Sequence, residues 1–276
     1  MKTKLLLFVT TLLMTTMGVK ADDAFVVWDA TNTTLYFSYG AIPTEDSWTN
    51  EAGNSVTVTK VWSGTDVTAS PTNGGPKWYG SSMNTATKAV FESSFASVKP
   101  TSLHYWFLNH VNLATFEGLQ YLDTSEATSM CAMFNTNKPT ILDISNFDTS
   151  KVENMANMFG WNGQLKTIIV GDKWDTSSVT ESGYMFYNSN GIVGEDGTVS
   201  TGAAEDNKDK AHTGAGGYLT KKTVSTVRPF TCNNLTFTLK EPIFHPESAS
   251  LSPCCNGTFP HHLPDKFGFS IILPLV

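Results

Sequence analysis

The sequence predicts an α/β fold, rich in β-strand, built as a short solenoid of three to four coils of about 25 residues. An internal repeat is the main observation. The triplet Asp-Thr-Ser begins at Asp123, Asp148 and Asp175, so its copies are 25 and then 27 residues apart. A Met-Phe pair follows each triplet, with the Met ten residues after the Asp. An antiparallel β segment is expected before the repeats and an irregular tail after them.

Residues 1–21 have the pattern of a secretory signal peptide. Lys2 and Lys4 precede an apolar run from Leu5 to Met17, and the ending Val19-Lys20-Ala21 suits cleavage after a small residue. The apolar run is shorter than the ~20 residues that a membrane-spanning helix needs. We therefore expect an exported chain with no membrane span after cleavage, located outside the cell or on its surface.

The charge balance argues against a nucleic-acid partner. Removing the three lysines of residues 1–21 would take the formal net charge from -7 to about -10. Arg228 is the only arginine, so the basic stripe that nucleic-acid binding requires is missing. Among the repeats the only cysteine is Cys131, which we expect to be a buried small hydrophobe. The repeats are then held by packing and not by disulfides.

Residues 22–92 are expected to form the N-terminal β segment. Segments 24–28, 34–40 and 55–62 are rich in β-branched and aromatic residues, and clusters of Asp, Asn, Thr and Gly separate them. Four tryptophans in this region fit either core positions, which are the commoner case, or a platform for carbohydrate. They are Trp28, Trp48, Trp62 and Trp78.

Residues 93–221 are expected to hold the repeat solenoid with its closing segment. Each repeat begins with a short apolar run that suits one strand of a parallel ladder. The Asp-Thr-Ser turn follows, and then one face of a two-turn helix, which Val152, Met155, Ala156 and Phe159 indicate by their spacing. The expected strands are Leu119 to Leu122, Ile141 to Ile144 and Ile168 to Val170.

The predicted helix of the middle copy has a capping box, with Ser150 as N-cap and Glu153 bonding back. The Met-Phe side chains are interpreted as a repeating core ladder. Phe107 precedes Phe134 by 27 residues, so residues 89–107 look like a divergent first repeat with Trp106 in the Met position.

Two glycine-rich or acidic stretches near the end of the repeats carry no recognisable ligand motif. Asp196, Glu205, Asp206 and Asp209 lack the D-x-D-x-D-G spacing of a calcium loop, so a solvated loop is expected. Residues 214–220 do not follow the strand-turn-helix pattern of a nucleotide-binding loop.

Residues 222–276 are expected to be an irregular, disordered tail or an out-of-frame end. They hold seven of the twelve prolines and three of the four cysteines, and they show no trace of the repeat. The pairs Cys254-Cys255 and His261-His262 lack the spacing that lets two ligands reach one zinc ion. No metal or cofactor site is predicted.

The segment LDISNFDTSKVENMANMF, from Leu142 to Phe159, closely resembles the repeat of BspA-like leucine-rich-repeat surface proteins of bacteria. The resemblance covers about residues 88–221 and is most specific over 119–186. It implies a leucine-rich-repeat-like solenoid in a secreted or cell-surface protein, with adhesion to host matrix proteins or other cells proposed for some members. It implies no catalytic residues.

Three functions follow from these features. The first is a non-catalytic adhesion or interaction module for an unknown protein or glycan ligand, using the residues that vary between coils, such as Asn146, Lys151 and Asn157. The second is a structural or antigenic surface component without a dedicated ligand. The third and weakest is a carbohydrate-active enzyme with two carboxylates. Its acids would be Asp123, Asp148 and Asp175. For nucleophilic catalysis, the sequence places no Ser or Cys nucleophile beside His104, His110 or His212.

Overall fold

The computed structural model describes residues 22–69, 75–79, 82–223, 230–232 and 235–237. The chain divides into two compact units, Met1–Lys222 and Thr223–Val276, which are treated separately below. The predicted signal peptide, most of the predicted tail and the Cys254-Cys255 and His261-His262 pairs lie outside the described residues. Within the described part, no helix has both the length and the apolar character needed to cross a membrane.

A mixed five-stranded sheet opens the first unit. Strands β1 (Asp23–Asp29) and β2 (Thr34–Gly40) form an antiparallel hairpin, and β5 (Lys60–Ser63) joins β1 on its other side. Strands β6 (Lys88–Phe91) and β7 (Thr115–Glu117) continue the sheet in parallel, which gives the order β5-β1-β2-β6-β7. The strands predicted at 24–28 and 34–40 are thus confirmed.

The segment predicted as one strand over 55–62 is two strands in different sheets. Strand β4 (Ser55–Thr57) pairs with β3 (Ser47–Thr49), and β5 begins at Lys60. The predicted alternation is present in β4, where Val56 is buried between two exposed neighbours. The break follows from the backbone, because Thr59 donates its N–H to Trp28 and Val58 donates to Asp46 on a different segment.

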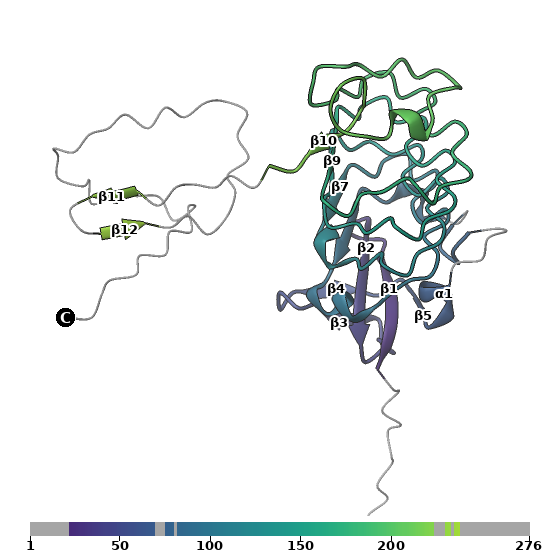
Figure 1. Cartoon of the computed structure of the whole chain (residues 1–276). Coiled ribbons are helices and arrows are strands. Elements are labelled where there is room, and N and C mark those ends of the chain that lie inside the picture. Colours follow the sequence, from purple (N-terminus) through teal and green to yellow (C-terminus); the bar gives the residue numbers. More distant parts are fainter. Residues whose placement is uncertain (1–21, 70–74, 80–81, 224–229, 233–234, 238–276) are drawn as a thin grey trace, which may run out of the picture. The chain divides into compact units, whose positions relative to one another are not determined.

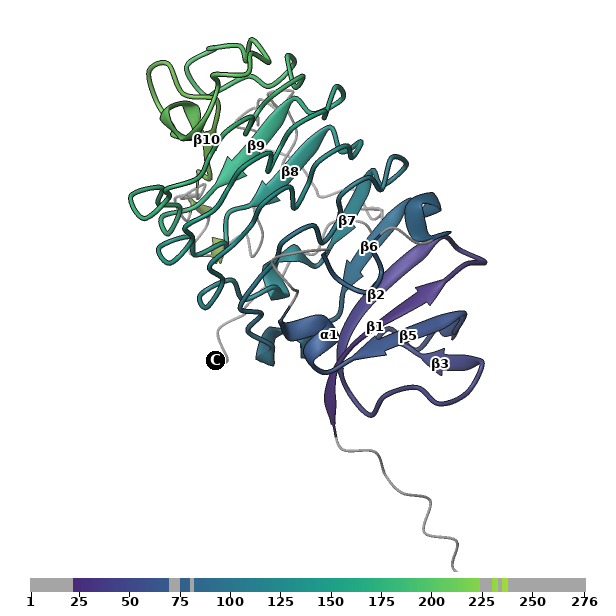
Figure 2. The ribbon, with the colours of Figure 1, turned by 90° about the vertical axis from the view of Figure 1, so that its right-hand side faces the viewer.

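A parallel three-stranded sheet carries the later repeats. It consists of β8 (Ile141–Ile144), β9 (Thr167–Val170) and β10 (Thr220–Lys221), in the order β10-β9-β8. Figure 2 shows the strands of the first unit following one another in a row from β5 to β10. The strand predicted over 119–122 is wrong, because Leu119–Tyr121 form a 3-10 helix, η3, after the left-handed Gly118.

The remaining helices are short. They are α1 (Thr65–Thr68), η1 (Ser82–Thr85), η2 (Ser93–Ser97) and η4 (Lys208–Lys210). In the second unit, β11 (Phe230–Cys232) and β12 (Leu235–Phe237) form an antiparallel pair, which the tail's composition did not predict.

Consecutive repeats are joined side by side through their backbones. Asn154 forms parallel bridges with both Ser129 and Glu181, one repeat away on either side. The N–H of Phe134 donates to Met158 at 3.0 Å, and the N–H of Phe159 donates to Met185 at 2.9 Å. These bonds use the donors that an α-helix would need internally.

The predicted α/β leucine-rich-repeat-like solenoid is therefore wrong. The structure is mostly β-strand and turn, with mixed and parallel sheets, and α1 is the only α-helix among the described residues. The segment from Val152 to Phe159, expected as a two-turn helix, has a β-bridge at Asn154 and a turn over 156–159, and Asn157 has φ of 58°, which a right-handed helix excludes. The capping box is also absent, because the Ser150 hydroxyl donates to Asp148 Oδ1 at 2.7 Å.

The core ladder predicted from the Met-Phe pairs is confirmed. Met133, Phe134, Met158, Phe159, Met185 and Phe186 are all 0% exposed, as are Trp106 and Phe107 of the divergent first repeat. The rings of Phe134 and Phe159 stack at 6.2 Å between centroids, and those of Phe159 and Phe186 at 5.5 Å. Each repeat therefore buries its aromatic ring against the ring of the next repeat, and no repeat buries its ring alone.

Candidate functional site

The Asp-Thr-Ser triplets are turns, as predicted. In each copy the Asp Oδ1 accepts the N–H of the Ser two residues later, at 2.9 Å for Asp123, 3.2 Å for Asp148 and 2.8 Å for Asp175. The threonine has a role that the sequence did not reveal. Thr149 Oγ1 donates to the Asp175 carbonyl at 2.7 Å and accepts the Asp175 N–H at 2.6 Å, so it ties two repeats together.

The surroundings of these aspartates lower the pKa of all three carboxyls. Partial burial would raise the pKa of Asp123, but hydrogen bonds from Ser125 and the charge of Lys99 outweigh it and lower that pKa. The Ser150 hydroxyl lowers the pKa of Asp148, and the Ser177 N–H lowers that of Asp175. A general acid needs a raised pKa, so the lowered pKa of these carboxyls favours a role as turn acceptors.

The histidines and Cys131 also have structural surroundings. Burial lowers the pKa of His104, whose ring stacks on Tyr105 at 3.7 Å, and that of His110, which is 0% exposed. His212 is exposed at the opposite end of the repeats. Cys131 is buried as predicted, and burial raises the pKa of its thiol to about 11, which keeps it protonated and unreactive at neutral pH.

The acidic loop does not gather its carboxylates around a cation. Asp206 accepts the hydroxyl of Tyr218 at 2.9 Å, and Asp196 accepts the N–H groups of Thr198 and Gly216. Within the described ranges, no cluster of three His, Cys, Asp or Glu side chains has metal-binding geometry.

Two series of left-handed residues lie on the turns of the repeats. Their positive φ values recur with the 27, 25 and 27 residue spacing of the repeats. Left-handed backbone is uncommon outside glycine and asparagine, so its recurrence shows that the turn geometry is imposed by the stacking. The first series is Tyr105, Ala132, Asn157 and Tyr184, and the second is Asn109, Thr136, Trp161 and Asn188.

Three aromatic side chains on these turns form what is here called the loop aromatic cluster: Trp161, Tyr184 and Tyr187. Trp161 is 44% and Tyr184 is 50% exposed, and Tyr187 is half-buried between them. The Tyr187 ring meets Trp161 edge to face at 4.8 Å and Tyr184 at 5.5 Å between centroids. No sequence motif predicted this cluster, although Tyr184 and Trp161 lie one and two residues from the Met-Phe pairs.

The residues that the sequence analysis left free for a partner have other roles. Asn146 Nδ2 donates to the carbonyls of Leu119 and Leu122, both at 3.0 Å, so it holds the neighbouring repeat. Lys151 forms an exposed ion pair with Glu126 at 2.8 Å, and Asn157 is half-buried in its turn.

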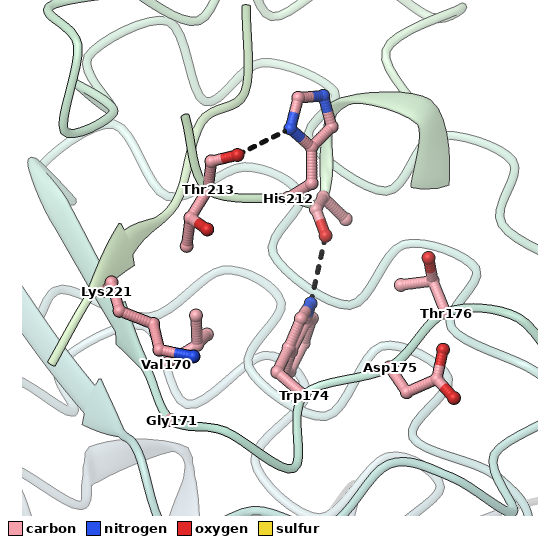
Figure 3. Close-up of a pocket in the computed structure, with 9 residues that line it drawn as sticks. Val170, Gly171, Trp174, Asp175, Thr176, His212, Thr213 and Lys221 are labelled. Carbon is pink, nitrogen blue, oxygen red and sulfur yellow. Dashed lines mark hydrogen bonds between the residues drawn. The ribbon is translucent and has the colours of Figure 1, made fainter. Parts of the chain in front are cut away.

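A pocket of about 230 Å³ lies beside β9 and β10 (Figure 3). Trp174 Nε1 donates to the Ala211 carbonyl at 2.9 Å across it, and His212 Nδ1 lies 2.9 Å from the Thr213 carbonyl. Lys221 is paired with Asp172 at 2.6 Å. The pocket is smaller than the roughly 300–1,000 Å³ of usual ligand sites, and its Trp174, Lys221 and Asp175 side chains already have partners, so it is a weak candidate.

The comparisons with known proteins place the repeats but give no activity. A family model described as a Mycoplasma protein of unknown function, DUF285, matches residues 101–212. The match covers less than half of the chain, so it shows a similarity of these residues and leaves the family of the chain open. No curated protein and no solved structure matches the chain.

Proposed function

We propose that the chain is an exported, non-catalytic interaction protein that binds a protein on another cell or on host matrix through the loop aromatic cluster. The observation that carries this proposal is the exposure of Trp161 and Tyr184 on a fixed backbone. Trp and Tyr are enriched in protein interfaces, and they supply much of the binding energy there.

The cluster is preorganised by its neighbours. The backbone N–H of Trp161 donates to the Tyr187 carbonyl at 2.7 Å, and the backbone N–H of Tyr187 donates to the Tyr184 carbonyl at 3.1 Å. A surface that is ordered before binding loses less conformational entropy when a partner docks. Three aromatic residues cover less than the ~800 Å² per partner of a stable complex, so we expect weak binding at a single site, strengthened where many copies act together.

The repeat and its relatives support a surface location. The Leu142 to Phe159 repeat resembles that of BspA-like surface proteins, and residues 101–212 match the DUF285 model. The signal-peptide pattern of residues 1–21 agrees with export. Because the repeated aspartates serve as turn acceptors, a binding role fits the repeats better than catalysis.

The test is surface plasmon resonance of the purified chain over immobilised fibronectin, fibrinogen, laminin and collagen. The variant carries both Trp161→Asn and Tyr184→Asn, because asparagine tolerates the left-handed backbone. Asparagine is already the residue at the equivalent position of a neighbouring repeat, Asn188 for Trp161 and Asn157 for Tyr184. We expect binding by the parent chain and at least a tenfold weaker affinity for the variant.

The matched control is Ile141→Thr, which removes a 57% exposed apolar side chain from β8 without altering the turns. It is expected to bind as the parent does. Binding no stronger than that of an unrelated repeat protein, or equal binding by the double variant, would contradict the proposal.

A further inference from the structure

A second hollow lies at the other end of the first unit, between the ends of β1 and β2 and the β3–β4 hairpin. Its volume is about 440 Å³, which falls within the roughly 300–1,000 Å³ of small-molecule sites. It is separate from the loop aromatic cluster, which contributes no lining residue. The lining side chains used below are Ser38, Tyr39, Trp48, Asn50, Glu51 and Ser94.

Trp48 and Tyr39 give this groove an aromatic surface. The other tryptophans of the N-terminal segment are core residues, with Trp28 4%, Trp62 6% and Trp78 0% exposed. Trp48 is only half-buried, and Tyr39 is 40% exposed. Of the four candidates for a carbohydrate platform, the structure therefore leaves Trp48 alone at the surface.

The position of the Trp48 ring is set by the sheet. It packs edge to face on Phe25 at 5.6 Å and on Tyr36 at 5.8 Å between centroids. Trp48 also pairs with Val56 in the β3–β4 ladder, so the ring is fixed from the backbone and from the core side. A fixed aromatic surface binds a flat apolar face without a further ordering cost.

Polar groups of the groove retain unused hydrogen-bonding capacity. Glu51 is not among them, because it accepts three bonds from Ser93 and Ser94, at 2.8, 2.6 and 2.8 Å, and the Ser94 hydroxyl also acts on it, which takes up the roughly four acceptor sites of a carboxylate. Asn50 uses its Oδ1 to accept the Asn54 N–H. In the described part of the chain, no acceptor bonds the Asn50 amide N–H₂ or the Trp48 indole N–H, and neither group is sealed from solvent.

The charge of the groove selects among ligands. Glu51 is the only charged residue in its lining. Partial burial would raise the pKa of Glu51, but Ser93 and Ser94 lower it to about 2, so the carboxylate is charged at neutral pH. An anionic ligand would be repelled, and no positive lining side chain is present to hold it.

We propose that this groove binds a neutral hexose unit of an oligosaccharide. The apolar C–H face of the sugar ring packs on Trp48 and Tyr39. Its hydroxyls accept from the Trp48 and Asn50 N–H groups. The hydroxyl-rich rim and apolar face of a sugar match these groups, whereas a purely apolar ligand would leave them unpaired.

The test is isothermal titration calorimetry of the full chain with cellohexaose, maltohexaose, mannohexaose and, as the anionic probe, hexagalacturonate. We expect saturable binding of at least one neutral probe and none of hexagalacturonate. Trp48→Ala and Tyr39→Ser are expected to weaken that binding at least tenfold, and Trp48→Phe to weaken it less than Trp48→Ala does.

Trp161→Asn is the matched control, because it removes an exposed tryptophan from the loop aromatic cluster and is expected to leave sugar binding unchanged. Thermal unfolding shows whether each variant is folded. If Trp48→Ala does not fold, Tyr39→Ser decides, since Tyr39 lies at the surface. Lack of binding by all neutral probes at millimolar concentration, or binding that Tyr39→Ser leaves unchanged, would overturn the proposal.

Discussion

Replacing Asn162 with alanine tests whether buried polar side chains hold the repeats together. Asn162 is 0% exposed. Its Oδ1 accepts the Asn137 N–H at 2.7 Å, and its Nδ2 donates to the Phe134 carbonyl at 2.7 Å and to the Phe159 carbonyl at 3.0 Å. The Phe159 carbonyl also accepts the Ser189 hydroxyl at 2.6 Å, so it keeps a partner when Asn162 is removed.

The substitution therefore leaves two buried backbone groups, the Asn137 N–H and the Phe134 C=O, without the partner they have in the parent. Each unsatisfied buried group costs about 1–3 kcal/mol. We expect Asn162→Ala to lower the free energy of unfolding by about 2–6 kcal/mol. This is a large share of the roughly 5–15 kcal/mol that stabilises a typical domain.

Urea unfolding followed by tryptophan fluorescence measures this loss. All seven tryptophans lie between residues 28 and 174, so the signal reports on the first unit alone. Asn112→Ala is the control, because Asn112 is exposed and its Oδ1 accepts only a surface bond from Lys138 at 3.3 Å. The control is expected to change stability by less than about 0.5 kcal/mol. A loss below about 1 kcal/mol for Asn162→Ala would show that water replaces its bonds.

Two further predictions concern the backbone and pH. A Cβ on Gly171 would lie 1.9 Å from the Ser145 carbonyl oxygen, so Gly171→Ala should lower the free energy of unfolding by about 1–3 kcal/mol in the same urea assay. Gly163→Ala is the control and should be nearly neutral, because a Cβ on Gly163 would have no atom within 4 Å. Because the folded pKa of Glu51 is about 2 against an ordinary 4.5, its stabilisation is present above about pH 4.5 and is lost as pH falls toward 2. Glu51→Gln should reduce the change of melting temperature with pH across that window, although solvent screening of this exposed group keeps the effect small. An unchanged pH dependence of the melting temperature would contradict the lowered pKa of Glu51.

The residues of the core were predictable from the sequence, but their backbone was not. Val152, Met155 and Phe159 are buried, as the helical spacing indicated. The same spacing also serves a chain of tight turns whose N–H groups bond the next repeat, as Met155 does to Glu181 at 2.8 Å. Side-chain periodicity reports which residues face inward and does not distinguish bonds within a segment from bonds between segments.

The buried polar ladder had a signal in the sequence that was not used. The residue three positions after each core phenylalanine is polar in all four repeats. These residues are His110, Asn137, Asn162 and Ser189, and all four are buried. Local motifs do not identify such a ladder, because Asn137, Asn162 and Ser189 bond to the backbone of the preceding repeat and acquire that partner only when the repeats stack.

The loop aromatic cluster was harder to predict, because its positions are set by left-handed turns that bulky residues seldom favour. Asn157, Asn109 and Asn188 would adopt such turns locally, whereas Tyr184 and Trp161 adopt them because the neighbouring repeats fix the backbone. Stacking thus stabilises a conformation that these two side chains disfavour. An asparagine would adopt the left-handed backbone at both positions with less strain, so the aromatic rings contribute little to the stability of the fold. The proposed partner would account for their exposure, and this is why the variant with Trp161→Asn and Tyr184→Asn should lose binding while remaining folded.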